Sequence, residues 1–373
     1  MKKGWQEKSV GDILQLEYGK PLDEADRKPD GRYPVYGANG EKDRTDKFYH
    51  DKPSIIVGRK GSAGEVNLTE KQFWPLDVTY FVTFDEKQHD LRFLYYLLTT
   101  LELTKLAKGV KPGINRNEVY SQTTRVPPLA EQQRIVGLLD EAFEGLATAK
   151  AKAEKNLQNA RALFESHLQS VFTQRGAGWK QKTLEEIATT FGRGKSKHRP
   201  RNEPKLYGGK YPFVQTGDIR NADHFITEYS QTYSDLGLAQ SKLWPKGTIC
   251  ITIAANIAET AILGFDACFP DSIIGVVANP KEAEVGFIEY LLQSFKARIQ
   301  ALGKGSAQAN INMGTFEHER FPFPPVAEQK QIVAKLDALS EETQHLARLY
   351  ERKHAALEAL KKSLLHQAFT GEL

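Results

Sequence analysis

The sequence has only two cysteines, no long apolar run and almost no excess of charge of either sign. Cys250 and Cys268 lie in apolar, strand-like runs and neither belongs to a CxxC pair, so we expect buried free thiols rather than a disulfide or a zinc ribbon. No stretch reaches the roughly 18 uncharged apolar residues that a membrane span needs, and the Met1–Lys8 start lacks the apolar core of a signal peptide. The expected location is cytoplasmic.

Signatures of catalysis are also scarce. The sequence contains no HExxH or GxSxG motif, and its nine histidines show no metal-ligand spacing. The Gly192–Arg201 segment resembles a phosphate-binding loop only superficially, because that motif would need a glycine where Thr189 stands. Asn279–Glu282 lacks the second proline and the aromatic residue of the Asn-Pro-Pro-aromatic motif of amino-methyltransferases. The sequence therefore favours a protein that is not an enzyme.

The most informative positive feature is an internal repeat. Pro127–Val136 (PPLAEQQRIV) returns as Pro324–Val333 (PPVAEQKQIV), and Phe93–Leu98 returns as Phe287–Leu292. The repeated unit of roughly 175–200 residues has the size of a domain with a connector, whereas solenoid repeats have about 20–50 residues. We expect two domains with internal pseudo-symmetry. Such a pair suits DNA with two half-sites, although a duplicated fold without a symmetric ligand is an equal alternative.

A long amphipathic helix is predicted after each domain. From residue 130 to 172 the apolar residues recur at steps of three and four, no proline interrupts them, and residues 332 to 368 repeat the pattern. At 1.5 Å per residue each helix would span about 60 Å, which is longer than one domain can cover. We expect the two stripes to pack together, with a dimerisation coiled coil or packing on another subunit as alternatives. The residues assigned to partner binding are Leu139, Leu146, Leu157, Phe164, Leu336, Leu346, Leu357 and Leu364.

The chain divides into four parts. Strands are expected at 53–58 and 78–84, and helical spacing runs from 91 to 106. The expected fold class is α+β, with two pseudo-symmetric α/β domains separated by two long antiparallel, coiled-coil-like helices. The parts are a first domain at 1–128, a central long helix at 129–175, a second domain at 176–325 and a C-terminal long helix at 326–373.

Glycine-rich loops with basic side chains recur in both domains. Lysine and arginine suit contacts to phosphate and bidentate reading of guanine, whereas asparagine and glutamine carry the paired donor and acceptor that an adenine edge needs. The alternatives are solvated loops, and asparagines that serve a turn. The residues assigned to DNA binding are Arg59, Lys60, Ser62, Lys108, Lys111, Asn115, Arg116, Lys195, Lys197, Arg199, Arg201, Asn256, Lys304, Gln308, Asn310 and Asn312.

With these features in order, the chain resembles a specificity subunit of a type I restriction-modification system over essentially its whole length. The resemblance rests on the Trp5 and Trp179 openings, on Ile56–Gly64 and Ile249–Ile257, on the paired Pro-Pro-x-Ala-Glu-Gln entries, and on the ending Phe369–Leu373.

The resemblance implies that each domain is a target-recognition domain for one half of a bipartite, gapped, asymmetric site in double-stranded DNA, and that the helices fix the spacer. It also implies two modification subunits that bind S-adenosylmethionine and methylate adenine, and restriction or translocase subunits that use ATP and Mg²⁺. The chain itself would hold no cofactor, metal or catalytic residue. The alternatives are a related system whose partner fuses methyltransferase and nuclease, a protein-protein scaffold, and a stand-alone methyltransferase.

Overall fold

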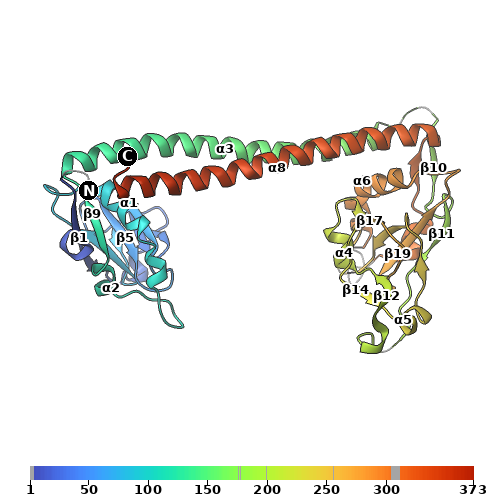
Figure 1. Cartoon of the computed structure of the whole chain (residues 1–373), viewed down its shortest axis with the longest axis horizontal. Helices are drawn as coiled ribbons and strands as arrows, with labels where there is room; N and C mark the ends of the chain where they lie inside the picture. The colour runs from blue at the N-terminus through green and yellow to red at the C-terminus, as the bar shows by residue number, and fades with distance from the viewer. Residues whose placement is uncertain (1–3, 175, 177, 199, 255, 304–310) are drawn as a thin grey trace. The chain divides into compact units, whose positions relative to one another are not determined.

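The chain forms two compact units in the computed structural model (Figure 1). Unit 1 contains Met1–Glu154 and Glu351–Leu373, and unit 2 contains Lys155–Tyr350. Each unit therefore combines one α/β domain with parts of both long helices. The structure describes residues 4–174, 176, 178–198, 200–254, 256–303 and 311–373.

Both predicted long helices are present, as α3 (Leu129–Thr173) and α8 (Val326–Thr370), with 45 residues each. In unit 1 the end of α8 shares a core with the beginning of α3, and in unit 2 the beginning of α8 shares a core with the end of α3. The two helices therefore run antiparallel. In unit 1, Lys150 pairs with Glu358 at 2.7 Å, and Glu154 lies 3.2 Å from His354.

Unit 1 contains three small sheets, and α1 lies between the sheet that contains β5 and the long helices (Figure 1). The main sheet has the strand order β2-β8-β5-β6 with β8 antiparallel to both β2 and β5. The other sheets have the orders β4-β3-β7 and β1-β9. The elements are β1 (Gln6–Ser9), β2 (Gln15–Tyr18), β3 (Tyr33–Gly37), β4 (Gly40–Thr45), β5 (Ser54–Gly58), β6 (Val66–Thr69), β7 (Trp74–Pro75), β8 (Thr79–Thr83), α1 (Leu91–Thr100), α2 (Arg116–Tyr120) and β9 (Thr123–Val126).

Unit 2 repeats this plan with additions. Its main sheet has the order β11-β19-β16-β17-β13, beside sheets of order β14-β12-β18-β15 and β10-β20. The elements are β10 (Lys180–Lys182), β11 (Ala188–Arg193), β12 (Tyr207–Phe213), α4 (Thr216–Asn221), β13 (Phe225–Ile226), β14 (Gln231–Tyr233), α5 (Asp235–Ala239), β15 (Leu243–Trp244), β16 (Ile249–Thr252), β17 (Thr260–Leu263), β18 (Ala267–Cys268), β19 (Ile273–Ala278), α6 (Val285–Gly303), α7 (Met313–Glu317) and β20 (Phe321–Phe323).

The two main sheets confirm the predicted pseudo-symmetry. The order β2-β8-β5-β6 corresponds to β11-β19-β16-β17, and β1-β9 corresponds to β10-β20. Several additional elements of unit 2, from α4 to β15, lie between Phe213 and Thr248, where the second sequence repeat is longer than the first. The strands predicted at 53–58 and 78–84 are present as β5 and β8. The helical stretch predicted to reach residue 106 is interrupted, because Glu102 adopts a left-handed φ of 48°.

A buried glutamine fixes the beginning of α3 to unit 1. Gln132 is completely buried, and its Nε2 donates to the main-chain oxygens of Pro127 at 2.9 Å and Gln88 at 3.0 Å. Its Oε1 accepts from the main-chain N–H of Asp90 at 2.9 Å. Since Asp90 caps α1 by accepting from the N–H of Phe93, one side chain connects the long helix to the start of the domain helix.

Gln329 makes the same arrangement in unit 2. Its Nε2 donates to the main-chain oxygens of Pro324 at 2.8 Å and Glu282 at 3.2 Å, and its Oε1 accepts from the N–H of Glu284 at 2.9 Å. Gln329 is also completely buried. The repeated Ala-Glu-Gln sequence therefore encodes an attachment between each domain and the beginning of its own long helix.

Aromatic residues attach each domain to both long helices. Phe93 of α1 packs on Phe369 near the end of α8, and Phe287 of α6 packs on Phe172 near the end of α3, with ring centroids 5.1 and 5.3 Å apart. A tyrosine one turn further along each domain helix, Tyr96 or Tyr290, donates to an aspartate near the start of that unit's own long helix. Each domain therefore holds one helix by its beginning and the other by its end.

The cysteines are both free and buried in unit 2, as expected. Among the described residues, no helix is long and apolar enough to cross a membrane.

Candidate nucleic-acid interface

An arginine occupies the exposed end of the main sheet in unit 1. Arg59 follows β5, and its Nε and Nη2 both donate to the main-chain oxygen of Asp77, with 3.0 Å from Nε. The guanidinium also lies over the ring of Tyr18, 5.4 Å from its centroid. Burial and the neighbouring Tyr18 raise the pKa of Tyr80, so this hydroxyl stays neutral beside the cation.

Other basic residues predicted to bind DNA lie beside Arg59. Arg116 of α2 covers the same Tyr18 ring, at 5.1 Å. The hairpin that carries Lys108 and Lys111 is closed by a bridge between Lys108 and Gly113, and Gly113 also bridges to Lys60. The structure therefore brings Arg59, Lys60, Lys108, Lys111 and Arg116 onto one end of unit 1. Ser62 is exposed in the turn after Lys60.

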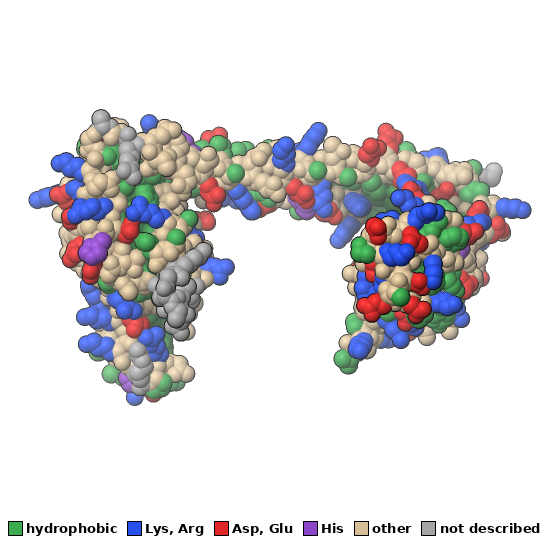
Figure 2. All heavy atoms as spheres, turned by 180° about the vertical axis from the view of Figure 1, so that it is seen from behind, with side chains coloured by type: hydrophobic (Ala, Val, Ile, Leu, Met, Phe, Trp, Pro, Cys, Tyr) green, Lys and Arg blue, Asp and Glu red, His purple; other side chains and the backbone are tan. Residues whose placement is uncertain are grey.

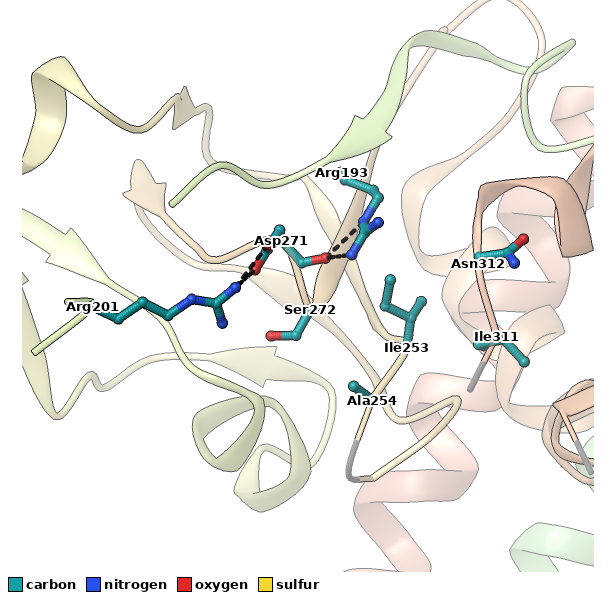
Figure 3. Close-up of a pocket in the computed structure, with 8 residues that line it drawn as sticks. All are labelled: Arg193, Arg201, Ile253, Ala254, Asp271, Ser272, Ile311 and Asn312. Carbon is teal, nitrogen blue, oxygen red and sulfur yellow. Dashed lines mark hydrogen bonds and ion pairs between the residues drawn. The ribbon is translucent and has the colours of Figure 1, made fainter. Parts of the chain in front are cut away.

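The corresponding end of unit 2 contains a cavity of about 340 Å³ (Figure 3). Arg193 donates its Nε and Nη2 to the main-chain oxygen of Asp271, at 2.7 Å from Nε. Arg201 approaches the same residue from the other side and places Nη2 2.9 Å from both carboxylate oxygens. The cavity is lined by Arg193, Arg201, Ile253, Ala254, Asp271, Ser272, Ile311 and Asn312.

Two of the asparagines predicted to read adenine, Asn115 and Asn312, are helix caps. The Oδ1 of Asn115 accepts from the N–H of Asn117 at 2.9 Å and caps α2, and the Oδ1 of Asn312 accepts from the N–H of Thr315 at 3.2 Å and caps α7. Both are exposed. The turn-serving alternative therefore describes one hydrogen bond of each Oδ1. An amide oxygen has a second lone pair, so the role of both residues in reading adenine stays a prediction.

The remaining predicted DNA-binding residues of unit 2 are more scattered. Lys195 and Lys197 are exposed in the loop after β11, and Asn256 is half-buried in the turn between β16 and β17. The DNA-binding role of these residues stays a prediction. Arg199, Lys304, Gln308 and Asn310 lie outside the described residues.

The leucines predicted to bind partners are covered to different degrees within the chain. Leu139 and Leu336 are 1% and 0% exposed, inside the cores of unit 1 and unit 2 respectively. A docked subunit would therefore have to contact other residues of the helices. The other six, which are half-buried, are Leu146, Leu157, Phe164, Leu346, Leu357 and Leu364.

Charge is distributed locally rather than over whole faces. On the face of unit 1 visible in Figure 2, lysine and arginine side chains are interspersed with aspartate and glutamate. Within the described part of the chain, no group of three or more histidine, cysteine, aspartate or glutamate side chains could hold a metal ion. The sites around Arg59 in unit 1 and Arg193 in unit 2, called the strand-end sites below, each hold a guanidinium on a main-chain oxygen. Their cations are suited to binding an anionic or acceptor-rich ligand.

Sequence composition did not identify Tyr18, Arg193 or the main-chain oxygens of Asp77 and Asp271 as parts of these sites. Arg193 belongs to the Gly192–Arg201 segment, whose glycines and proline predict a loop, but it is the last residue of β11. Sheet register would have identified it, because register places the ends of neighbouring strands side by side.

Comparisons with known proteins agree with the architecture. The model of the type I restriction modification DNA specificity domain matches residues 2–158 and 177–352. A putative type I restriction enzyme specificity subunit of Haemophilus influenzae is 25% identical over 344 residues, which cover 85% of this chain and 86% of that protein. A putative type I specificity subunit of Mycoplasma pneumoniae is 25% identical and covers 88% of each chain.

Two solved structures share the fold. The HsdS subunit from Thermoanaerobacter tengcongensis aligns over 100% of this chain and 98% of its own, with a TM-score of 0.64 and 19% identity. A chain from a structural study of complex assembly and conformational transition in the type I restriction-modification system aligns over 100% of this chain and 99% of its own, with a TM-score of 0.79 and 18% identity.

Since the family model covers most of its length in two matched segments, the chain belongs to the type I restriction modification DNA specificity domain family. This membership, together with the relatives, identifies a specificity subunit that is not itself an enzyme.

Proposed function

We propose that each unit reads one half of a bipartite, gapped site in double-stranded DNA. The observation that carries this proposal is the duplication of an exposed, arginine-bearing site at the same end of the main sheet in both units. Because the residues around the two sites differ, the two half-sites would differ in sequence, and the complete site would be asymmetric.

The long helices would set the gap between the half-sites. At 1.5 Å per residue, 45 residues extend over about 65 Å, a length on the scale of two turns of duplex DNA. The helices are attached to the domains by Gln132, Gln329, Phe172 and Phe369. Such attachments would make the gap a property of the helices, independent of the bases that each domain reads.

The chain would act within a larger complex, as one subunit. Two modification subunits would supply S-adenosylmethionine and methylate adenine, and restriction subunits would use ATP and Mg²⁺. Docking on the helices would use their outer faces and the half-buried leucines, because Leu139 and Leu336 are covered within the chain.

Methylation mapping tests this proposal. Genomic DNA from cells that express this chain with its modification partner should carry methyladenine in one gapped motif, and deletion of the chain should abolish methylation of that motif alone. Persistence of the motif after deletion would contradict the proposal. The subunit composition of the purified complex would distinguish separate modification and restriction subunits from a partner that fuses both activities.

A further inference from the structure

The register of the main sheets aligns the two strand-end sites residue by residue. In unit 1, β8 pairs Tyr80 with Tyr18 of β2 and Thr79 with Gly58 of β5. In unit 2, β19 pairs Ile274 with Arg193 of β11 and Ile273 with Thr252 of β16. Tyr18 therefore corresponds to Arg193.

The next residue along gives the second correspondence. The N–H of Arg59 donates to the main-chain oxygen of Val78, the residue before Thr79. In the same way, the N–H of Ile253 donates to the main-chain oxygen of Ser272, the residue before Ile273. Arg59 therefore corresponds to Ile253, and Asp77 corresponds to Asp271. The acceptor is the same main-chain oxygen in both units, but the arginine that binds it comes from opposite neighbouring strands.

A guanidinium thus occupies the same place in both units although its position in the sequence has moved. The side chains around the guanidinium differ accordingly. At the position of Arg193, unit 1 has Tyr18, which stacks on Arg59. At the position of Arg59, unit 2 has the buried Ile253. Arginines from two different strands thus bind equivalent main-chain oxygens, those of Asp77 and Asp271. This indicates that the cation is needed at this place for a reason other than local packing.

The way each arginine binds leaves one edge of its guanidinium unused. Nε and one Nη2 hydrogen are directed at the Asp77 or Asp271 oxygen. No described residue accepts from Nη1 of Arg59 or of Arg193. The terminal edge, formed by Nη1 and the second Nη2 hydrogen, has the geometry that matches two neighbouring acceptor oxygens or an oxygen and a ring nitrogen.

We propose that Arg59 and Arg193 are equivalent DNA contacts, each of which presents this terminal edge to a pair of acceptors in its own half-site. The inference rests on the proposed function and adds Arg193 to the interface. The acceptors are either O6 and N7 of a guanine or two oxygens of one phosphate, since both match the guanidinium fork. The aspartate carbonyls position the cations and reduce the rotational freedom that binding would otherwise remove.

An exchange in unit 1 provides the sharpest test. In the complex with its modification partner, Arg59→Ile should weaken binding to the duplex that methylation mapping identifies by roughly 5- to 150-fold, the range for one bidentate contact. The double variant Tyr18→Arg/Arg59→Ile reproduces the arrangement of unit 2 and should recover most of this loss, because it returns a guanidinium to the Asp77 oxygen from the other strand. Arg125→Ile, at an exposed arginine of β9, is the matched control and should bind as the wild type does.

In unit 2 the reverse exchange would place arginine at the buried Ile253, so simple replacements are preferable there. Arg193→Ala should weaken binding to a similar degree, and Arg193→Lys should not restore it, because lysine lacks the planar fork. Loss of discrimination at one base pair would identify guanine as the acceptor. A uniform loss across sequences, with the salt slope reduced by about one, would identify a phosphate.

The outcomes separate this inference from the proposed function. If the wild-type complex does not bind or methylate a gapped site, the proposed function fails irrespective of the arginines. If the wild type binds but Arg59→Ile and Arg193→Ala bind equally well, only the present inference is wrong. Failure of the folded double variant to recover binding, with thermal unfolding as in the wild type, would also overturn it.

Discussion

Close packing against neighbouring backbone atoms, more than the backbone conformation, requires a glycine at position 64. Gly61 and Gly64 both have left-handed φ values, of 84° and 88°. A Cβ at Gly64 would lie 2.4 Å from the main-chain N of Thr104 and 2.6 Å from the oxygen of Leu103, whereas a Cβ at Gly61 would meet no described atom within 4 Å. Ala258 has the corresponding place in unit 2 with a φ of 62°, so alanine is compatible with this conformation.

We predict that Gly64→Ala destabilises the protein by about 3 kcal/mol or more, because backbone atoms must move to admit the methyl group. Gly61→Ala should cost only about 1 kcal/mol, the conformational penalty. Urea unfolding of the two variants measures both values. Equal losses would show that Leu103 and Thr104 do not constrain Gly64.

The ion pair between His224 and Glu289 predicts how stability depends on pH. His224 Nδ1 lies 2.7 Å from Oε2 of Glu289, whose side chain is completely buried, and the imidazole stacks on Tyr290. Burial alone would lower the pKa of His224, but the hydrogen bond and charge of Glu289 outweigh it and raise the pKa above its ordinary value. The protonated pair therefore contributes its full stability below the unfolded pKa of about 6.5 and loses it as pH rises through the folded pKa.

The free energy of unfolding should accordingly fall as pH rises above about 6.5, the unfolded pKa of histidine, and His224→Gln should make this fall shallower. His318→Gln, at an exposed histidine, is the control and should leave the slope as it is in the wild type. Denaturant titrations at a series of pH values give the slopes. An unchanged slope in His224→Gln would assign the pH dependence to other groups.

For individual residues, the sequence predicts which residue types belong to the candidate sites better than it predicts the role of each residue. Asn115 and Asn312 each cap a short helix, a role that a glycine-rich loop context does not predict. The role of Arg193 depends on sheet register, which composition does not encode. Asp77 and Asp271 act through their main-chain oxygens, which residue type does not encode, and the Asp271 carboxylate also pairs with Arg201.

Among the elements, the long helices were the easiest to predict, since an apolar step of 3.6 over more than forty residues admits little else. The end of α1 was not predictable from periodicity. The apolar pattern continues through Leu103 and Leu106, but Glu102 turns the chain in a left-handed conformation that glutamate seldom adopts. Leu103 is nevertheless buried, and Leu103–Leu106 form a separate 3-10 helix, so the apolar pattern predicted the burial and missed the break at Glu102.

The attachment of the long helices to the domains depends on the buried amides of Gln132 and Gln329. Replacement of either by alanine leaves one N–H and two carbonyl oxygens without their partner, and should cost about 3 kcal/mol of unfolding free energy. The exposed neighbours Gln133 and Gln331 provide matched controls, whose alanine variants should lie within about 0.5 kcal/mol of the wild type. Thermal or urea unfolding gives the comparison. Losses as small as those of the controls would mean that water replaces the missing amide.

For the whole molecule, the ordered repeat predicts two similar domains and two helices, but it does not predict how the helices are shared. The sequence places each helix as a separate part after its own domain. Each compact unit instead contains the beginning of one helix and the end of the other, because Phe369 joins the core beside Phe93 and Phe172 joins the core beside Phe287. Such long-range partners leave no local signal in the sequence.

This sharing leads to a direct test of the helices as the spacer. Four residues inserted after Glu154 in α3 and before His354 in α8, two residues that face each other at 3.2 Å, would lengthen both antiparallel helices together. The insertion adds about 6 Å and slightly more than one helical turn, so the apolar faces stay approximately aligned. The helical content and thermal unfolding of the variant should match those of the wild type. This control establishes that the pair of α3 and α8 is intact.

The decisive measurement is methylation mapping of DNA from cells that express this insertion variant with the modification partner. If two domains read two half-sites at a distance set by the helices, both half-sites should keep their sequences while the gap between them grows by one or two base pairs, since the rise of DNA is about 3.4 Å per base pair. A folded variant that methylates the original site with the original gap would contradict this account of the chain.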